Sequence, residues 1–205
     1  VPRLRGHLAH LAHGLVEHNK DLSVLILTGS PIIGSFDFRA RVDFVRIPGV
    51  IKLRNGDYTT LSLLIDIEET LAMRQSIIHH TADIFDPDLF IVDKEPLGLR
   101  GEVKNTLMML KERGVPLVLG LRDVMDEPGL LAPEWGRKNV LPALRDLYDD
   151  IWVYGLPQIC DPLAEISLPK SVREKVTFTG YLRRFEPAAM IKAPTHPIRG
   201  PYILV

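Results

Sequence analysis

Three charged residues, Asp93, Lys94 and Glu95, directly follow a short apolar run at residues 89–92. An acid, a base and a second acid side by side could exchange protons with a bound ligand or hold its polar groups. The run before them contains no polar residue, which is typical of a strand covered on both faces in a parallel sheet. Ligands of open α/β sheets bind at the carboxyl ends of the strands. We therefore expect these three residues to lie on a functional edge.

Other polar residues follow two further predicted strands, at residues 22–28 and 115–121. Because the carboxyl ends of parallel strands meet at one edge, we expect four of these residues to bind ligand: Gly29, Ser30, Arg122 and Asp123. A structural interpretation is equally open. In that interpretation Arg122 and Lys94 neutralise the nearby carboxylates, and the edge is an ion-pair cluster.

His7 is the candidate general base. It follows Gly6 at the predicted start of a helix, where backbone N–H groups and the helix dipole favour an anion, so Gly6 is a candidate ligand-binding residue too. An imidazole titrates near neutral pH, which suits a base. His10 and His13 repeat the spacing of three, but no carboxylate lies among them, so we expect a polar helix face and no metal site.

The elements that must position these residues alternate along the chain. Apolar runs predict strands, and apolar residues at helical spacing predict the helices between them. The predicted strands span residues 22–28, 43–47, 89–92, 115–121, 151–154 and 176–179. Residues 50–60 are predicted to form a surface loop or lid, and residues 124–139 a long loop with some helical character at most. Arg74 is predicted to face solvent from the helix within residues 61–85. This alternation predicts an α/β fold with a doubly wound, Rossmann-like parallel sheet.

Composition narrows the classes of function. The 205 residues are 46% hydrophobic, which is ample for the core of one large domain or two small ones. Lys and Arg total 25 against 26 for Asp and Glu, so no nucleic-acid surface is indicated. A single cysteine, Cys160, excludes an internal disulfide and favours a reducing compartment, so we expect a cytoplasmic protein. No apolar run approaches the roughly 20 residues that span a bilayer.

Both ends of the sequence suggest a piece of a longer protein. Residue 1 is Val, and the chain opens almost directly into a helical pattern, so we expect the first strand of the sheet to be missing. We assign residues 1–184 to one Rossmann-like domain. Residues 185–201 are rich in proline and suit an interdomain linker. Residues 202–205 would then begin a truncated C-terminal domain.

Six motifs, in order, resemble the N-terminal domain of predicted bacterial glycosyltransferases of the GT-B type, a family related to the MurG-like N-acetylglucosaminyl transferases. The motifs are Gly6-His7-Leu8, Leu27-Thr28-Gly29-Ser30-Pro31, Pro87-Asp88 with Val92-Asp93-Lys94-Glu95-Pro96-Leu97-Gly98, Val118-Leu119-Gly120-Leu121-Arg122-Asp123, Val153-Tyr154-Gly155 and Thr179-Gly180-Tyr181. The resemblance covers nearly the whole chain. It departs at the family's glycine-rich loop, of which only the last glycine and the histidine remain at Gly6 and His7.

The resemblance implies that this chain is the acceptor-side, N-terminal half of a two-domain enzyme. The enzyme would move a sugar from a nucleotide-sugar donor, bound by the absent C-terminal half, to a hydroxyl of a small-molecule or lipid-linked acceptor. No cofactor besides the donor is expected, and this half alone should be inactive. A lipid-linked acceptor would bring the protein to the inner face of the membrane, where the apolar residues 50–53 could make peripheral contact.

Glycosyl transfer needs a hydroxyl made nucleophilic by a base and stabilisation of the departing nucleotide. We assign His7 as the base, with Glu95 and Asp93 as competing catalytic carboxylates, and expect His7→Ala or Glu95→Ala to lower turnover. The ligand-binding residues are then Gly6, Gly29, Ser30, Lys94, Arg122 and Asp123. Two other functions stay open: a GT-B-like epimerase acting on the nucleotide sugar itself, and a non-catalytic module that binds a sugar or nucleotide.

Overall fold

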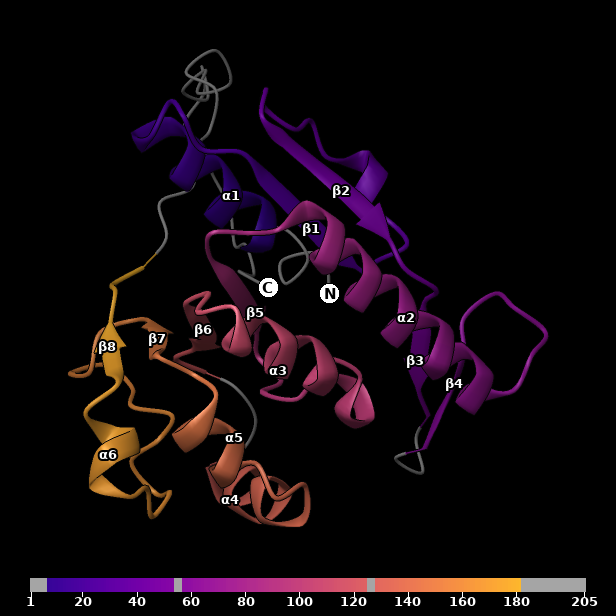
Figure 1. Cartoon of the computed structure of the whole chain (residues 1–205). Helices are drawn as coiled ribbons and strands as arrows, with labels where there is room; N and C mark the ends of the chain where they lie inside the picture. Colours follow the sequence, from indigo (N-terminus) through magenta and orange to yellow (C-terminus); the bar gives the residue numbers. More distant parts are fainter. Residues whose placement is uncertain (1–6, 54–56, 125–127, 182–205) are drawn as a thin grey trace, which may run out of the picture.

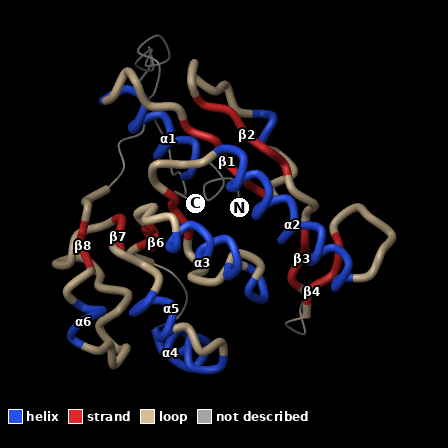
Figure 2. The backbone as a smooth tube through the Cα atoms, in the orientation of Figure 1, coloured by secondary structure: helices blue, strands red, loops and turns tan. Residues whose placement is uncertain are grey.

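The fold is mixed α/β and contains a four-stranded parallel sheet flanked by helices (Figure 1). The computed structural model describes residues 7–53, 57–124 and 128–181. Strands and helices alternate along most of this length, as the sequence predicts. Figure 2 shows the same arrangement with helices and strands separated by colour.

The four-stranded sheet holds the centre of the main core. Its strands β5 (Phe90–Asp93), β6 (Leu117–Arg122), β7 (Asp150–Tyr154) and β8 (Val176–Phe178) pair in sequence order, and every pair is parallel. β6 is apolar except for its last residue, and its first five residues are buried. Helix α3 (Lys104–Glu112) packs on β6 and buries Leu107 and Leu110 completely. Four parallel strands therefore end at one edge, as predicted.

A second parallel pair precedes this sheet in the chain. β1 (Val24–Thr28) and β2 (Val42–Arg46) pair in parallel, and helix α1 (His7–His18) packs on both. The connection between the strands contains a single 3-10 turn, η2 (Ile33–Ser35). A small cluster that includes Val16 and Ile26 fills the space between α1 and the pair. In the described ranges the two parallel sheets share no strand pairing.

Helix α2 (Ile67–Phe85) follows the β1–β2 pair in the chain and leads into β5, the first strand of the four-stranded sheet. Asp66 caps its N-terminus, because its side chain accepts a hydrogen bond from the backbone N–H of Glu68 at 3.0 Å. Asp86 adopts the left-handed conformation with a φ of 47° and ends the helix before Pro87. The helix starts six residues later than the helical pattern from residue 61 predicts.

Two predicted loops contain regular structure. Residues 50–60 include an antiparallel hairpin of β3 (Val50–Lys52) and β4 (Tyr58–Thr60), so the prediction of a loop there is wrong. The apolar Ile51 and Leu53 of this hairpin region are exposed. Residues 124–139 contain helix α4 (Pro128–Arg137), which buries Leu131 and Trp135 in the main core. Apolar burial of those two residues outweighs the helix-breaking residues of the segment.

Short helical segments lead into three later elements of the chain. Two short helices, α5 (Leu141–Asp146) and α6 (Lys170–Arg173), precede β7 and β8, and a 3-10 turn, η3 (Leu99–Gly101), precedes α3.

β5 is not covered on both faces, because only Val92 is buried and its other residues are half-buried. The prediction of full burial is therefore wrong for this strand. No helix in the described ranges is long and apolar enough to cross a membrane.

Candidate functional site

The carboxyl ends of β5, β6 and β7 bring three polar side chains together. Asp93 is the last residue of β5 and pairs in register with Gly120, while Arg122 ends β6 opposite Tyr154 of β7. The Nη2 atom of Arg122 lies 3.5 Å from Oδ2 of Asp93, and about four-fifths of each side chain is buried. The structure thus unites the predicted residues Asp93 and Arg122 and adds Tyr154.

The second carboxylate oxygen of Asp93 is available to accept a further hydrogen bond. Oδ1 is buried and accepts no hydrogen bond within the described part of the chain. Burial raises the pKa of the neighbouring Tyr154 phenol, and the negative charge of Asp93 raises it further, so Tyr154 stays protonated at neutral pH. A hydroxyl donor from a ligand would satisfy the unused oxygen of Asp93.

Gly120 makes room for the Tyr154 ring. A Cβ added at Gly120 would lie 2.4 Å from the Tyr154 hydroxyl oxygen and 2.9 Å from two ring carbons. Gly120→Ala therefore has to displace a rigid, buried ring, and we expect the free energy of unfolding to fall by about 1–3 kcal/mol. Urea unfolding followed by circular dichroism measures this change.

The matched control for that substitution is Gly14→Ala in α1. A Cβ at Gly14 meets no atom within 4 Å, and Ala is the better helix former, so the control should gain about 0.5–1 kcal/mol. Equal effects of the two substitutions would show that the Tyr154 ring does not depend on the missing side chain at residue 120.

Lys94 and Glu95 form a tight turn after β5. Lys94 has a φ of 69°, which a residue with a side chain rarely adopts, and its N–H donates to the Gly120 carbonyl at 2.8 Å. The N–H of Glu95 donates to the Asp93 carbonyl at 2.9 Å. Backbone strain of this kind concentrates at functional sites. The turn keeps both residues at the edge of the sheet.

Glu95 is held by a lysine from α4. The Lys138 ammonium lies 2.8 Å from a Glu95 carboxylate oxygen and 2.7 Å from one of Glu134. Burial alone would lower the pKa of Lys138, but the hydrogen bonds that it donates to Glu134 and Glu95 raise it above its ordinary value. Lys138 is therefore charged at neutral pH, and Glu95 is an anchored carboxylate.

Asp123 joins the exits of β6, β7 and β8. Tyr181, which follows β8, donates its hydroxyl hydrogen to Oδ2 of Asp123 at 2.7 Å. That hydrogen bond, assisted by burial and by the charge of Asp123, raises the pKa of Tyr181. A Cβ at Gly155, just after β7, would lie 2.5 Å from Cβ of Asp123, so the two backbones approach closely there. The thiol of Cys160 reaches the Asp123 carbonyl at 3.2 Å.

Gly29 and Ser30 lie at the exit of β1, where a buried arginine supports them. Nη1 of Arg74 donates to the Pro48 carbonyl at 2.6 Å, and a Cβ at Gly29 would lie 2.7 Å from the same nitrogen. The hydroxyl oxygen of Ser30 is buried and makes no hydrogen bond in the described residues. Gly29 therefore lies beside Arg74.

Arg74 also binds Glu102, which precedes α3. Nε and Nη2 of Arg74 each lie 2.6 Å from an oxygen of the Glu102 carboxylate, and both side chains are at least nine-tenths buried. One Glu102 oxygen also accepts the N–H of Leu99 at 3.3 Å. The prediction that Arg74 faces solvent is therefore wrong, because the guanidinium exchanges water for a bidentate partner.

Gly6 and the side chain of His7 lie outside the described part of the structure. His7 is the first residue of α1. No group of three or more His, Cys, Asp or Glu side chains able to hold a metal ion occurs among the described residues. The described part of the candidate site therefore consists of Asp93, Arg122 and their neighbours.

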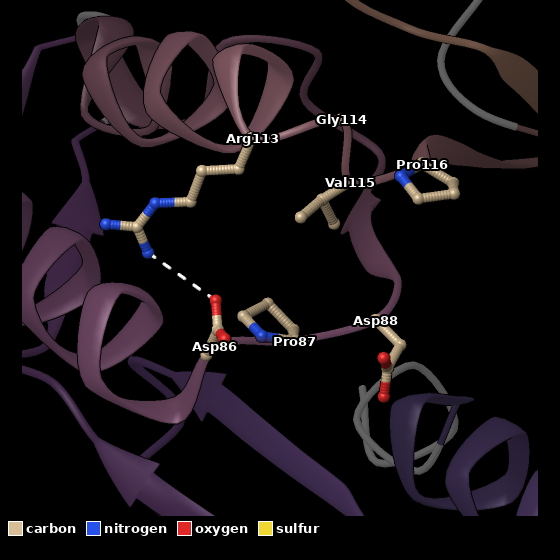
Figure 3. Close-up of a pocket in the computed structure, with 7 residues that line it drawn as sticks. All are labelled: Asp86, Pro87, Asp88, Arg113, Gly114, Val115 and Pro116. Atoms are coloured by element: carbon tan, nitrogen blue, oxygen red, sulfur yellow. Dashed lines mark ion pairs between the residues drawn. The ribbon is translucent and has the colours of Figure 1, made fainter.

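A pocket lies at the opposite edge of the sheet, before β5 and β6 (Figure 3). Arg113 points across it toward Asp86, with 3.6 Å between the guanidinium and the carboxylate, and also pairs with Asp83. Asp88 lines the pocket as well. This is the turn that links α2 to β5, so the aspartates serve the connection, as their proline-containing sequence predicts.

Sequence reasoning missed four residues that build the site. Tyr154 and Tyr181 follow the ordinary pattern of strand-end aromatics, and the glycine that makes room for the Tyr154 ring, Gly120, lies on a different strand. Arg74 and Glu102 are 28 residues apart, and no local spacing connects them. Comparisons of the chain with protein-family models, with curated proteins and with solved structures found no match, so the site is interpreted from its own geometry.

Proposed function

We propose that this chain is the acceptor-side domain of a GT-B type glycosyltransferase similar to the MurG-like family. The observation that carries the proposal is the meeting of Asp93, Arg122 and Tyr154 at the carboxyl edge of a parallel sheet. Ligands of open α/β sheets bind at that edge. A carboxylate oxygen with unused acceptor capacity, beside a guanidinium and a phenol, suits a ligand that carries several hydroxyl groups.

In the proposed reaction, each of these groups has a separate role. Oδ1 of Asp93 accepts the hydrogen of one acceptor hydroxyl and so fixes the acceptor, and His7 remains the proposed base that removes the proton from the attacking hydroxyl. Glu95 is held by its ion pair with Lys138 at 2.8 Å, so it orients the turn and the ligand. Lys94, Arg122 and Asp123 line the acceptor side.

The finer architecture belongs to the same proposal. Under it, the two parallel sheets are parts of one doubly wound sheet, and a second Rossmann-like domain binds the nucleotide-sugar donor. The acceptor is a small molecule or a lipid-linked saccharide. Sugar transfer then takes place in the cleft between the domains, with Asp93 on the acceptor wall.

The test uses the full-length protein and measures release of nucleoside diphosphate from UDP- and GDP-sugars, with hydroxylated acceptors present or absent. The proposal expects release that rises when a suitable acceptor is added, and a glycosylated product detectable by mass spectrometry. A modified sugar without any acceptor dependence would indicate the epimerase and would overturn the proposal.

A non-catalytic binding module is the second candidate. The observation in its favour is that each described carboxylate of the edge already has a partner: Asp93 with Arg122, Glu95 with Lys138, and Asp123 with Tyr181. Isothermal titration of the full-length protein with the same sugars distinguishes it. Tight binding together with complete absence of transfer and hydrolysis would support the module against the enzyme.

A further inference from the structure

The turns that follow β1 and β2 lie against each other. The N–H of Ile47 donates to the Thr28 carbonyl at 3.0 Å, so the two strands end side by side. A Cβ at Gly29 would lie 3.6 Å from the Pro48 carbonyl oxygen, and a Cβ at Gly49 would lie 3.3 Å from the Gly29 carbonyl oxygen. The two glycines therefore let the turns approach closely.

Ser30 carries the hydroxyl group of the first turn. Its backbone N–H donates to the Thr28 hydroxyl at 3.2 Å, which fixes the start of the turn. Its own hydroxyl oxygen makes no hydrogen bond within the described residues. The residue as a whole is only half-buried, so rotation about its Cα–Cβ bond can turn the hydroxyl toward solvent. Ser30 thus has a hydroxyl for a ligand at the end of a parallel strand, as Asp93 has a carboxylate.

The loop between β5 and α3 is held by its own hydrogen bonds. The N–H of Gly98 donates to the Glu95 carbonyl at 2.8 Å, and that of Val103 donates to the Leu97 carbonyl at 3.3 Å. Gly98 has a φ of 67°, and a Cβ there would lie 2.9 Å from Cγ of Glu102. The loop therefore holds the Glu102 side chain in a fixed position relative to the end of β5.

One guanidinium connects the two turns to this loop. Nη1 of Arg74 donates to the Pro48 carbonyl at 2.6 Å and lies beside Gly29. Nε and Nη2 hold the Glu102 carboxylate, also at 2.6 Å. Strand pairing does not join β1 or β2 to β5 in the described ranges. The Arg74 side chain is consequently a buried polar link between the two sets of strand ends.

We propose that Arg74 is a positioning residue: it holds the turn after β1 against the loop after β5, so that Ser30 and Asp93 contact the same ligand. This role rests on the proposed function, in which Asp93 binds an acceptor hydroxyl. Asp93 belongs to a strand and is held by the pairing of β5 with β6. Ser30 follows its strand, so its position depends on the packing of its turn against Arg74. A rigid guanidinium suits this role, because it fixes direction as well as distance.

A kinetic comparison of substitutions in two backgrounds tests this role in the full-length protein. The altered background is Arg74→Met with Glu102→Leu, which removes the link without leaving a buried unpaired charge. In the unaltered background we expect Ser30→Ala to reduce kcat/KM for the acceptor about 5-fold, as loss of a hydrogen bond between neutral groups does. In the altered background the same substitution should reduce it by less than about twofold, because Ser30 is no longer held at the ligand.

Asp93→Asn is the internal control for this comparison. It should have about the same effect in both backgrounds, since strand pairing holds Asp93 without Arg74. Arg113→Met is the matched arginine control, because its ion pair with Asp86 lies at the opposite edge of the sheet. In that background Ser30→Ala should keep its full effect. A lower folded fraction reduces all rates equally, so these ratios report position and not stability.

Arg74→Lys provides a second altered background if the double variant folds poorly. Lysine keeps a positive charge opposite Glu102 but lacks the fork that also reaches Pro48, so it should weaken the effect of Ser30→Ala in the same way. An equal effect of Ser30→Ala in every background, or no effect in the unaltered one, would overturn the positioning role alone. An unaltered protein that releases no nucleoside diphosphate with any acceptor would overturn the proposed function, and this role with it.

Discussion

Replacing Arg74 with methionine is expected to lower the free energy of unfolding by about 3–5 kcal/mol, the largest effect that the structure predicts for one side chain. The substitution leaves the Glu102 carboxylate buried without the two 2.6 Å bonds to Nε and Nη2. It also removes the donor to the Pro48 carbonyl. Urea unfolding monitored by tryptophan fluorescence and by circular dichroism measures the loss.

Two further variants separate the buried pair from general damage. Arg74→Met combined with Glu102→Leu removes both charges and should recover much of the loss, because an apolar pair of similar volume avoids the unpaired carboxylate. Arg100→Met breaks an exposed ion pair with Glu68, so it should change stability by less than about 1 kcal/mol. A double variant no more stable than Arg74→Met would contradict the explanation.

Arg74 also shows where sequence reasoning fails. Its position beside Glu68 and Glu69 on α2 suggests a solvated helix face, yet it is buried where the exits of β1 and β2 meet the segment before α3. Its partner is distant in sequence, so neither periodicity nor charge spacing reveals the pair. Only the folded chain brings the guanidinium to Glu102.

Strands and helices were predictable where burial is strong and continuous. β6 is the clearest case, because an unbroken apolar run with a charged end has few alternatives. The β3–β4 hairpin was missed because its strands have three residues each, too short for alternation to be visible. α4 was missed because Pro133 lies inside it, while burial of Leu131 and Trp135 stabilises the helix from its apolar side.

The candidate site was predictable in part for the same reason. Asp93 and Arg122 follow apolar strands, and parallel pairing necessarily brings such strand ends together. Tyr154 was not recognised from the sequence, because a tyrosine at the end of an apolar run resembles a residue of the hydrophobic core. The structure shows its position, because the Tyr154 ring lies where a side chain at Gly120, two residues before Arg122, would be.

Asp93→Asn is expected to reduce kcat/KM for the acceptor about 10- to 100-fold in the full-length enzyme. Under the proposed function, the carboxylate accepts a hydrogen bond from an acceptor hydroxyl through Oδ1. Hydrogen bonds to charged groups contribute about 1.5–3 kcal/mol, and each 1.4 kcal/mol corresponds to a factor of ten. The amide keeps the shape of the side chain but lacks the charge. Initial rates of nucleoside diphosphate release at varied acceptor concentration measure the change.

Asp88→Asn is the matched control, because Asp88 lies at the amino end of the same strand, beside the pocket of Figure 3. It should leave kcat/KM for acceptor and donor within about twofold of the unaltered enzyme, since ligands of such sheets bind at the carboxyl ends. Because the contact of Asp93 with Arg122 is long, at 3.5 Å, and asparagine keeps a side-chain oxygen and the same shape, Asp93→Asn should lower stability by only about 1 kcal/mol. Reduced activity with so small a change in stability would therefore locate the effect in ligand binding, whereas equal rates for the two variants would remove Asp93 from the acceptor site.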